Sequence, residues 1–483
     1  MARSPWRGRA ARAARLGAVV IGAEGLWRLA SAGAAYLRSP YSADYGEGTV
    51  LVLARLLAEG RYFGTVDAYP MVHAIYPPLF PALVHAGFAV LGEPVLWLPR
   101  LLSLLATLAV VLLLAGLLRE EGHGRLDAAL WGTAFVLPWF VQTWAPRGRV
   151  DLQALAFTLA GLALHRAATR ERRRGRLVGA WLFFAFAFFT RHSAVLAPCA
   201  VLLDGLLDPT RRRRVPGEAC LGLALIGGPL LVLHLATGGA SSRHLFVYTV
   251  DVHYEWGRAL SSLGQFASVA GGVAVLALAV VACRGPHAVF RQGRALVLYG
   301  AMAMGSFAAI AKSGAAQNYM IEPWLGLLLI ASVCWRTLDR PGLFPGLLLL
   351  VALAAASFAG RDLERLPRPI RAPHNAWESA ELDRLIRDAR GPVLSENLAA
   401  LVLARRQVWV DPVNLPHMER RGHADLSSLR TDCRARRFAL VVDEYRLRAI
   451  PGLRECMIEH YEPVRDLGRY RVSRPRPRVP APE

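Results

Sequence analysis

Long apolar runs alternate along this chain with short polar links, and many of these links are rich in arginine. A helix of about 20 apolar residues is long enough to cross the ~30 Å hydrocarbon core of a bilayer. Bounding each apolar run at its flanking charges predicts about eleven such helices. They lie near 15–37, 95–118, 126–144, 150–168, 177–190, 194–207, 218–236, 264–283, 294–311, 320–335 and 342–359. The pattern therefore predicts an α-helical polytopic membrane protein.

One apolar segment, 77–92, is ambiguous, because it is short and contains three prolines. Arginine in short loops concentrates on the cytoplasmic side of a membrane. Arginines cluster in the loops 169–176, 208–217, 284–294 and 336–340. These loops share the cytoplasmic side with the basic N-terminus, 1–14, only if 77–92 dips into the bilayer and returns. We therefore predict a dip, which places the first loop, 38–94, and the C-terminal tail on the extracytoplasmic face.

The chain changes character where the transmembrane domain, 15–360, ends. An amphipathic helix pattern is followed by short β-rich runs, which predicts a small extracytoplasmic α/β domain over 361–473. Its predicted elements are helices over 375–390 and 425–436, strands at 392–395, 407–410 and 438–442, and a hairpin over 463–472. The arginine- and proline-rich end, 474–483, is predicted to be disordered. Cys433 and Cys456 can pair if this tail is exported, and two unlinked thiols fit the sequence equally well.

The composition agrees with a membrane location: 54% of the residues are hydrophobic and only 19% are charged. Soluble domains are closer to about 25% charged. The net charge of +21 comes almost entirely from arginine, with Lys312 as the single lysine. The arginines form short clusters between apolar runs instead of one basic face, which favours membrane topology over nucleic-acid binding. The expected partner is the lipid bilayer.

An acidic pair in the first loop, Asp44 and Glu47, is the main candidate for chemistry. The two residues are three positions apart, so one helical turn places both carboxylates on one face. A carboxylate at the boundary between lipid and water can act as a general base toward an acceptor hydroxyl. Either residue can also simply cap a helix over 48–59. The pattern alone leaves both interpretations open.

These residues belong to a series of short motifs with a characteristic order. The series is Asp44-Tyr45-Gly46-Glu47-Gly48, the run 54–60, Tyr62, Tyr76-Pro77-Pro78-Leu79 and Arg100-Leu101-Leu102-Ser103. It resembles the first half of bacterial GT-C glycosyltransferases, in particular glycosyltransferase family 39, and is similar to protein O-mannosyltransferases and lipid A aminoarabinose transferases. Later matches are Arg149-Val150-Asp151, Thr190-Arg191-His192-Ser193 and Lys312-Ser313-Gly314 followed by Asn318-Tyr319. The resemblance covers the membrane region, about three-quarters of the chain.

The resemblance implies a GT-C-like transmembrane domain, catalytic acidic residues in the first outer loop and a polyprenyl phosphate sugar as donor. One position departs from the aminoarabinose transferases, which carry a lysine directly before the proline that closes this loop. Tyr76 occupies that place here, and the nearest basic residue is His73. The group that binds the donor phosphate must therefore come from elsewhere in the chain.

Loss of a lipid phosphate builds negative charge in a poorly hydrated place, where a fixed cation is most effective. The candidate donor phosphate-binding residues are Arg191, His192, Lys312 and His73. Snorkelling of the basic side chains to the membrane interface is the alternative. The candidate substrate-binding residues are Tyr76, Arg149, Asp151, Asn318, Tyr319 and Glu322. For Asp151, pairing with Arg147 or helix capping is the competing interpretation.

The loop 237–263 contains His244, Asp251, His253 and Glu255, a set of residue types that can bind metals. Their spacing fits no strong zinc pattern, so we predict neither a metal nor another cofactor.

The sequence therefore predicts an integral, multi-pass glycosyltransferase of the inner or plasma membrane, of the inverting GT-C type. It would transfer a hexosyl or pentosyl group from a polyprenyl phosphate donor to an acceptor on the extracytoplasmic face, with Asp44 or Glu47 as the base. The alternatives are a multi-pass transporter or lipid flippase, and a structural or sensory membrane protein that uses the tail for binding. Carriers place polar residues at mid-depth between inverted halves, whereas here the polar residues gather at one face.

Overall fold

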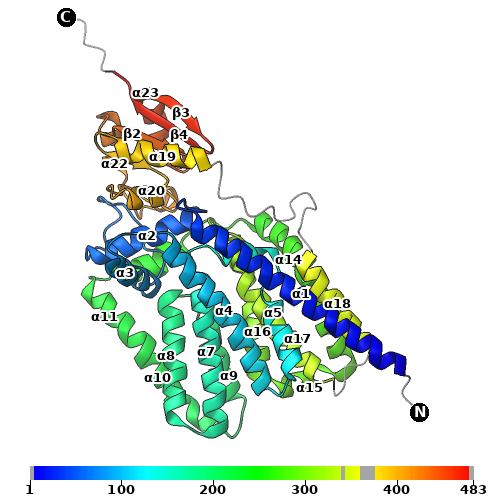
Figure 1. The fold of residues 1–483 in the computed structure, drawn as a ribbon. Coiled ribbons are helices and arrows are strands. Elements are labelled where there is room, and N and C mark those ends of the chain that lie inside the picture. Colours follow the sequence, from blue (N-terminus) through cyan, green and yellow to red (C-terminus); the bar gives the residue numbers. More distant parts are fainter. Residues whose placement is uncertain (1–4, 339–342, 359–375, 478–483) are drawn as a thin grey trace, which may run out of the picture. The chain divides into compact units, whose positions relative to one another are not determined.

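The computed structural model describes residues 5–338, 343–358 and 376–477, which are mostly helical with one small sheet (Figure 1). The chain divides into two compact units. The first, which we call the membrane unit, consists of Met1–Ala34, Leu101–Leu231 and Tyr254–Pro369. The second, the loop–tail unit, combines Ala35–Arg100, Val232–His253 and Ile370–Glu483. The first loop and the C-terminal tail therefore belong to one compact body.

The membrane unit is helical throughout its described part. Its α-helices are α1 (Pro5–Arg38), α4 (Trp97–Glu120), α5 (Arg125–Ala134), α6 (Trp139–Trp144), α7 (Val150–Glu171), α8 (Arg174–Thr190), α9 (Leu196–Leu206), α10 (Val215–Gly222), α11 (Gly228–Ala236), α14 (Trp256–Arg284), α15 (Pro286–Gln292), α16 (Arg294–Gly305), α17 (Ile321–Arg336) and α18 (Leu343–Phe358). Short 3₁₀ and π segments join some of them: η1 (Arg212–Arg214), η2 (Leu223–Gly227), η4 (Ser306–Ala311) and η5 (Gln317–Met320). Helices α1, α4 and α11 each continue into the loop–tail unit at one end.

Within the described residues, five helical stretches are long and apolar enough to cross a bilayer. They are Trp97–Glu120, Arg212–Ala236, Trp256–Arg284, Arg294–Ala311 and Gln317–Arg336. Shorter apolar helices cover Leu79–Leu91, Leu196–Leu206 and Gly346–Phe358. The predicted helical, polytopic architecture is confirmed.

Three predicted segments differ from the structure. The predicted helix 126–144 is broken into α5 and α6, and Pro138 stands at the break because proline lacks an N–H and restricts the residue before it. The predicted loop 237–263 contains short helical turns and the first two turns of α14. The predicted helix 218–236 is interrupted by the π segment η2.

The membrane unit is held together by close helix packing, most clearly between α16 and α17 (Figure 1). A Cβ atom added at Gly300 would lie only 2.6 Å from the carbonyl oxygen of Gly326, and one at Gly326 would lie 2.7 Å from that of Gly300. Glycine is therefore needed at both positions for the two backbones to approach. This approach fixes the first turn of α17, which carries Glu322.

The loop–tail unit contains short helices and a four-stranded sheet. Its helices are α2 (Tyr45–Ala58), α3 (Leu79–Leu91), α12 (Ala240–Ser242), η3 (Arg243–Val247), α13 (Tyr248–Val250), α19 (Ala376–Asp388), α20 (Leu398–Leu403), α21 (Leu415–Arg420), α22 (Ser427–Arg434), η7 (Leu447–Ala449) and α23 (Leu453–His460). The strands are β1 (Val393–Ser395), β2 (Leu440–Asp443), β3 (Tyr461–Leu467) and β4 (Tyr470–Pro475). The strand order is β1-β2-β4-β3, with β1 parallel to β2 and the other pairs antiparallel.

The predicted α/β character of the tail is confirmed by α19, α22, the sheet and the hairpin of β3 and β4. The run 407–410, predicted as a strand, is not one: it forms only an isolated bridge between Val410 and Met71. A single bridge cannot extend here, because Pro412 follows and has no N–H to donate. The predicted start of the tail domain, 361–375, lies outside the described residues. Most of the predicted disordered end, 474–483, also lies outside them, although β4 extends to Pro475.

The core of the loop–tail unit joins the first loop to the tail. Buried side chains of α2 pack in one cluster with buried side chains of α20 and of the sheet. The α2 members are Leu51, Val52, Leu53 and Leu56, and the tail contributes Leu398, Leu401, Val442 and Val472 among others. Each fully buried side chain of this kind contributes about 1.5–3 kcal/mol to stability. The tail thus shares its core with the helix that follows the acidic pair.

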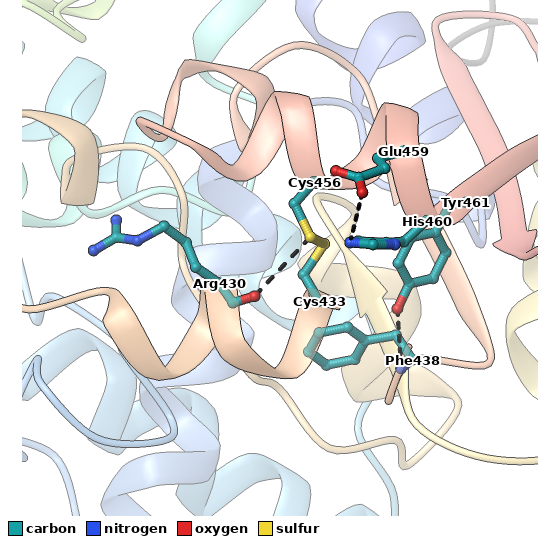
Figure 2. Close-up of a disulfide and its surroundings, with 7 residues drawn as sticks. All are labelled: Arg430, Cys433, Phe438, Cys456, Glu459, His460 and Tyr461. Atoms are coloured by element: carbon teal, nitrogen blue, oxygen red, sulfur yellow. Dashed lines mark hydrogen bonds and ion pairs between the residues drawn. A yellow bond between two sulfur atoms is a disulfide. The ribbon is translucent and has the colours of Figure 1, made fainter. Parts of the chain in front are cut away.

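A disulfide closes the tail, where the sequence leaves the pairing open. Cys433 of α22 and Cys456 of α23 are bonded, with their Cα atoms 6.3 Å apart (Figure 2). Both cysteines are buried. Beside them the hydroxyl of Tyr461 accepts a hydrogen bond of 3.3 Å from the backbone N–H of Phe438. The bond joins two helices through cysteines that are 23 residues apart in sequence.

Candidate functional site

The first turn of α2 carries the acidic pair. Asp44 is the N-cap residue, and its Oδ1 accepts a hydrogen bond of 3.0 Å from the backbone N–H of Glu47. In return, Oε2 of Glu47 accepts one of 2.6 Å from the backbone N–H of Ala43. This reciprocal arrangement resembles a capping box and satisfies two backbone donors at the helix start. Asp44 therefore caps α2, which is one of the two interpretations that the sequence leaves open.

Glu47 is completely buried and bound by Arg100 of α4. The guanidinium donates two parallel hydrogen bonds, from Nε to Oε1 at 2.7 Å and from Nη2 to Oε2 at 2.8 Å. Its Nη1 donates to the carbonyl oxygens of Tyr36 and Ser39, at 2.6 Å each. A bidentate, charge-assisted pair with its remaining donors satisfied is stable inside a protein. Glu47 is therefore fixed, while Asp44 stays partly exposed.

The two other candidates of the first loop also have defined contacts. His73 is buried, with its Nε2 at 2.9 Å from the carbonyl oxygen of His244 and its Nδ1 at 3.2 Å from the amide nitrogen of Asn414. Both ring nitrogens are engaged inside the loop–tail unit, which favours a structural role for His73 over phosphate binding. The backbone of Tyr76 accepts a hydrogen bond of 3.0 Å from the hydroxyl of Tyr62.

A second polar cluster lies in the membrane unit around Asp151, near the start of α7. Asp151 is buried, and its Oδ1 accepts a hydrogen bond of 3.0 Å from the amide of Asn318. Nη1 of Arg191 lies 3.4 Å from the same oxygen, and Nε of Arg149 lies 3.9 Å from Oδ2. The carboxylate is thus shared by one amide at hydrogen-bond distance and two guanidinium groups at longer distances. Asp151, Arg191 and Glu322 line one small pocket.

Aromatic side chains and a serine position the basic members of this cluster. The guanidinium of Arg191 lies over the ring of Tyr319, 5.1 Å from its centroid, and that of Arg149 lies 5.3 Å from the ring of Trp144. The hydroxyl of Ser103 hydrogen-bonds the backbone of Arg149 at both its N–H and its C=O. Glu322 accepts a hydrogen bond of 3.2 Å from the hydroxyl of Tyr299.

Lys312 adds to the positive field near Arg191, and His192 lies within reach of both charges. Burial, together with the charges of Arg191 and Lys312, lowers the pKa of His192 to about 4, so its ring is neutral at pH 7. Burial and the charge of Arg191 also lower the pKa of Lys312. Like charges that oppose one another in this way are stabilised by a bound anion. The cluster is therefore suited to hold a phosphate.

The candidates thus fall into two groups. Asp44, Glu47, His73 and Tyr76 belong to the loop–tail unit. The structure brings the other predicted residues together in the membrane unit: Arg149, Asp151, Arg191, His192, Lys312, Asn318, Tyr319 and Glu322.

Comparisons with known proteins agree with this architecture. A family model described as dolichyl-phosphate-mannose-protein mannosyltransferase matches residues 76–233. Two crystal structures of ArnT from Cupriavidus metallidurans, one in the apo state and one bound to undecaprenyl phosphate, both align with a TM-score of 0.62. Their sequence identities to this chain are 14% and 16%. Each alignment covers 94% of this chain and 97% of the ArnT chain. The chain has the GT-C fold. No curated protein sequence matches it significantly.

The GT-C fold confirms the resemblance that the sequence motifs predicted. Sequence analysis missed the role of Arg100, although an arginine within the apolar run Leu98–Ser103 is a signal that a buried partner exists. It also missed Tyr299, which gives no signal because its partner Glu322 is 23 residues away on another helix.

The possible metal ligands of loop 237–263 have other contacts. Nδ1 of His244 accepts a hydrogen bond from the backbone N–H of Ala74, and its Nε2 donates to the carbonyl oxygen of Gly64. Asp251 pairs with His423 at 2.8 Å. Among the residues that the structure describes, no group of three or more His, Cys, Asp or Glu side chains is arranged to hold a metal ion.

Proposed function

We propose that this protein is an integral membrane glycosyltransferase that transfers a sugar from a polyprenyl phosphate donor to an acceptor on the extracytoplasmic face. The GT-C fold supports the general activity, and one structural neighbour is bound to undecaprenyl phosphate. The observation that carries the proposal is the cluster around Arg191, whose guanidinium lies 3.4 Å from Asp151 and 5.1 Å from the centroid of the Tyr319 ring, with its charge also acting on Lys312. A phosphate bound there would be stabilised by both cations.

In the proposed reaction, an acceptor hydroxyl oxygen attacks the anomeric carbon of the donor sugar. The bond from that carbon to the phosphate oxygen breaks, and the phosphate leaves with the electron pair. The hydroxyl proton goes to a carboxylate, and one displacement of this kind inverts the anomeric configuration. Arg191 and Lys312 stabilise the charge that develops on the departing phosphate.

Asp44 is the proposed base. Both oxygens of Glu47 are bound by Arg100, and protonating Glu47 would leave that guanidinium buried without its counter-charge. Asp44 is partly exposed, whereas Glu47 is completely buried. We assign Glu47 the task of holding the first turn of α2, so that Asp44 is presented in one orientation.

The Cys433–Cys456 bond supports an extracytoplasmic tail, because disulfides form and persist mainly in oxidising compartments. An exported tail also agrees with the arginine distribution, which predicts a cytoplasmic N-terminus.

The test is to incubate the purified full-length protein with a panel of polyprenyl phosphate sugars and to measure released carrier by mass spectrometry. Wild type is expected to release the carrier from at least one donor. Asp44→Asn is expected to lose transfer and keep its thermal stability. The matched control is Asp67→Asn, in the same loop, whose carboxylate is exposed and accepts hydrogen bonds from the backbone N–H of Asp425 and the hydroxyl of Thr65. Full activity of Asp44→Asn would exclude it as the base.

A further inference from the structure

The tail packs directly against the first turn of α2. A Cβ atom added at Gly48 would lie 2.9 Å from the backbone nitrogen of Ala399 and 3.0 Å from Cβ of Leu398. The start of α20 therefore touches α2 at its backbone, four residues after Asp44. Asn397, which caps α20 by accepting from the N–H of Ala400, also lies 3.5 Å from the hydroxyl of Ser42. The tail thus contacts the acidic turn both before Asp44 in the sequence, at Ser42, and after it, at Gly48.

One arginine of the tail contacts the residue that follows Asp44. The guanidinium carbon of Arg446 lies 4.9 Å from the centroid of the Tyr45 ring. Its Nη1 lies 3.0 Å from Oε2 of Glu444 and 3.7 Å from Oε2 of Glu396. A guanidinium over an aromatic ring is attracted by the ring quadrupole, and the interaction strengthens when the pair is partly desolvated. The Arg446 side chain is only 22% exposed, so it meets this condition.

A buried carboxylate fixes the loop that carries Arg446. Oε1 of Glu396 accepts three backbone hydrogen bonds, from Glu444 at 3.0 Å, Tyr445 at 3.1 Å and Leu447 at 2.9 Å. The Glu396 side chain has no exposed surface. The three bonds hold residues 444–447 in one conformation, so Arg446 is presented to Tyr45 from a rigid support. Such support is what a precisely placed functional group requires.

We propose that Arg446 is a positioning residue for the acidic turn: through the ring of Tyr45 it sets the orientation in which α2 presents Asp44. This inference rests on the proposed function, since it assigns the tail a task in the same reaction. It differs from a binding role for the tail, because Arg446 is proposed to act through α2. A shift of about 1 Å in a reacting group can reduce the rate about a hundredfold, so a support of this kind affects turnover.

The experiment compares the full-length Arg446→Ala variant with Arg437→Ala. Arg437 is a matched control in the same unit: its guanidinium lies 4.8 Å from the ring of Trp409, and it pairs with Asp432 at 2.7 Å. For Arg446→Ala we expect kcat to fall by about tenfold to a hundredfold while the KM for the donor changes little. Arg446→Lys, which keeps the charge over the ring, is expected to recover part of kcat. Arg437→Ala is expected to keep the wild-type kcat.

Amide hydrogen exchange of residues 44–49 tests the positioning independently of activity. We expect Arg446→Ala to accelerate this exchange and leave exchange in β2 and β4 unchanged, while Arg437→Ala leaves residues 44–49 as in wild type. Unchanged exchange at 44–49, or faster exchange throughout the loop–tail unit, would overturn the inference. If wild type transfers no sugar, the proposed function fails, and the exchange result still decides whether Arg446 holds the acidic turn.

Discussion

The two units use buried carboxylates in opposite ways. In the loop–tail unit, Glu47 is bound by one arginine in a bidentate pair at 2.7 and 2.8 Å, inside a tightly packed turn. In the membrane unit, Asp151 is shared between Arg191 at 3.4 Å and Arg149 at 3.9 Å, and it lines a pocket. In the first case one guanidinium binds both carboxylate oxygens, whereas in the second two guanidinium groups lie near one carboxylate at longer distances. Burial and charge alone therefore do not distinguish a structural carboxylate from one in a binding site.

The largest expected effect is on the saturated pair. Arg100→Ala leaves Glu47 buried without its counter-charge, which costs about 3–5 kcal/mol of stability. We expect the purified Arg100→Ala variant to unfold at a much lower temperature than wild type, and tryptophan fluorescence measures this temperature. The double variant Arg100→Leu with Glu47→Leu removes both charges and is expected to recover most of this loss. A single variant as stable as wild type would show that the pair does not hold the turn.

Arg191→Met should affect turnover and leave folding nearly intact. Loss of one group that stabilises developing negative charge typically lowers kcat by about a hundredfold to a thousandfold. The measurement is carrier release under saturating donor, with the unfolding temperature recorded in parallel. Arg258→Met is the control, since Arg258 belongs to the same unit and forms a partly exposed pair with Glu255. If both variants released carrier at the wild-type rate, Arg191 would have no part in stabilising the leaving group.

The disulfide gives a prediction confined to the loop–tail unit. A cross-link that closes a loop of this size contributes about 2–4 kcal/mol, so Cys433→Ala with Cys456→Ala should destabilise the tail by this amount. Hydrogen exchange is expected to rise in α22 and α23 and to stay constant in α16 and α17. Reducing the disulfide of wild type with dithiothreitol should reproduce this exchange pattern. Cys334→Ala removes a free cysteine and, without dithiothreitol, should leave the exchange as in wild type. Equal exchange before and after reduction would contradict this assignment.

Local sequence rules predicted what neighbouring residues determine. The α/β character of the tail and the helical, polytopic architecture followed from pattern and propensity, while the N-cap at Asp44 was one of the interpretations left open. The division of labour between Asp44 and Glu47 did not, because it depends on Arg100, 53 residues after Glu47. The contact of Tyr45 with Arg446 spans most of the chain and leaves no periodic signal. The run 407–410 satisfies the propensity rule for a strand because it is rich in β-branched and apolar residues, but Val410 forms only an isolated bridge, which Pro412 prevents from extending.

The smallest expected effect is a pH dependence of the loop–tail unit. Burial raises the pKa of Asp411 from 3.8 to about 7, although the backbone N–H of Val413 and the charge of Arg446 oppose the shift. The folded state therefore holds this proton at pH values where the unfolded chain releases it. Its contribution to stability is full below about pH 4 and is lost as the pH rises through about 7. We expect Asp411→Asn to flatten the dependence of the unfolding temperature on pH between about 4 and 8 and to raise that temperature most at the upper end.

Asp425→Asn is the control, because Asp425 is exposed and its pKa is shifted downward by hydrogen bonds from Ser427. A wild-type profile in Asp411→Asn would mean that another group carries the dependence.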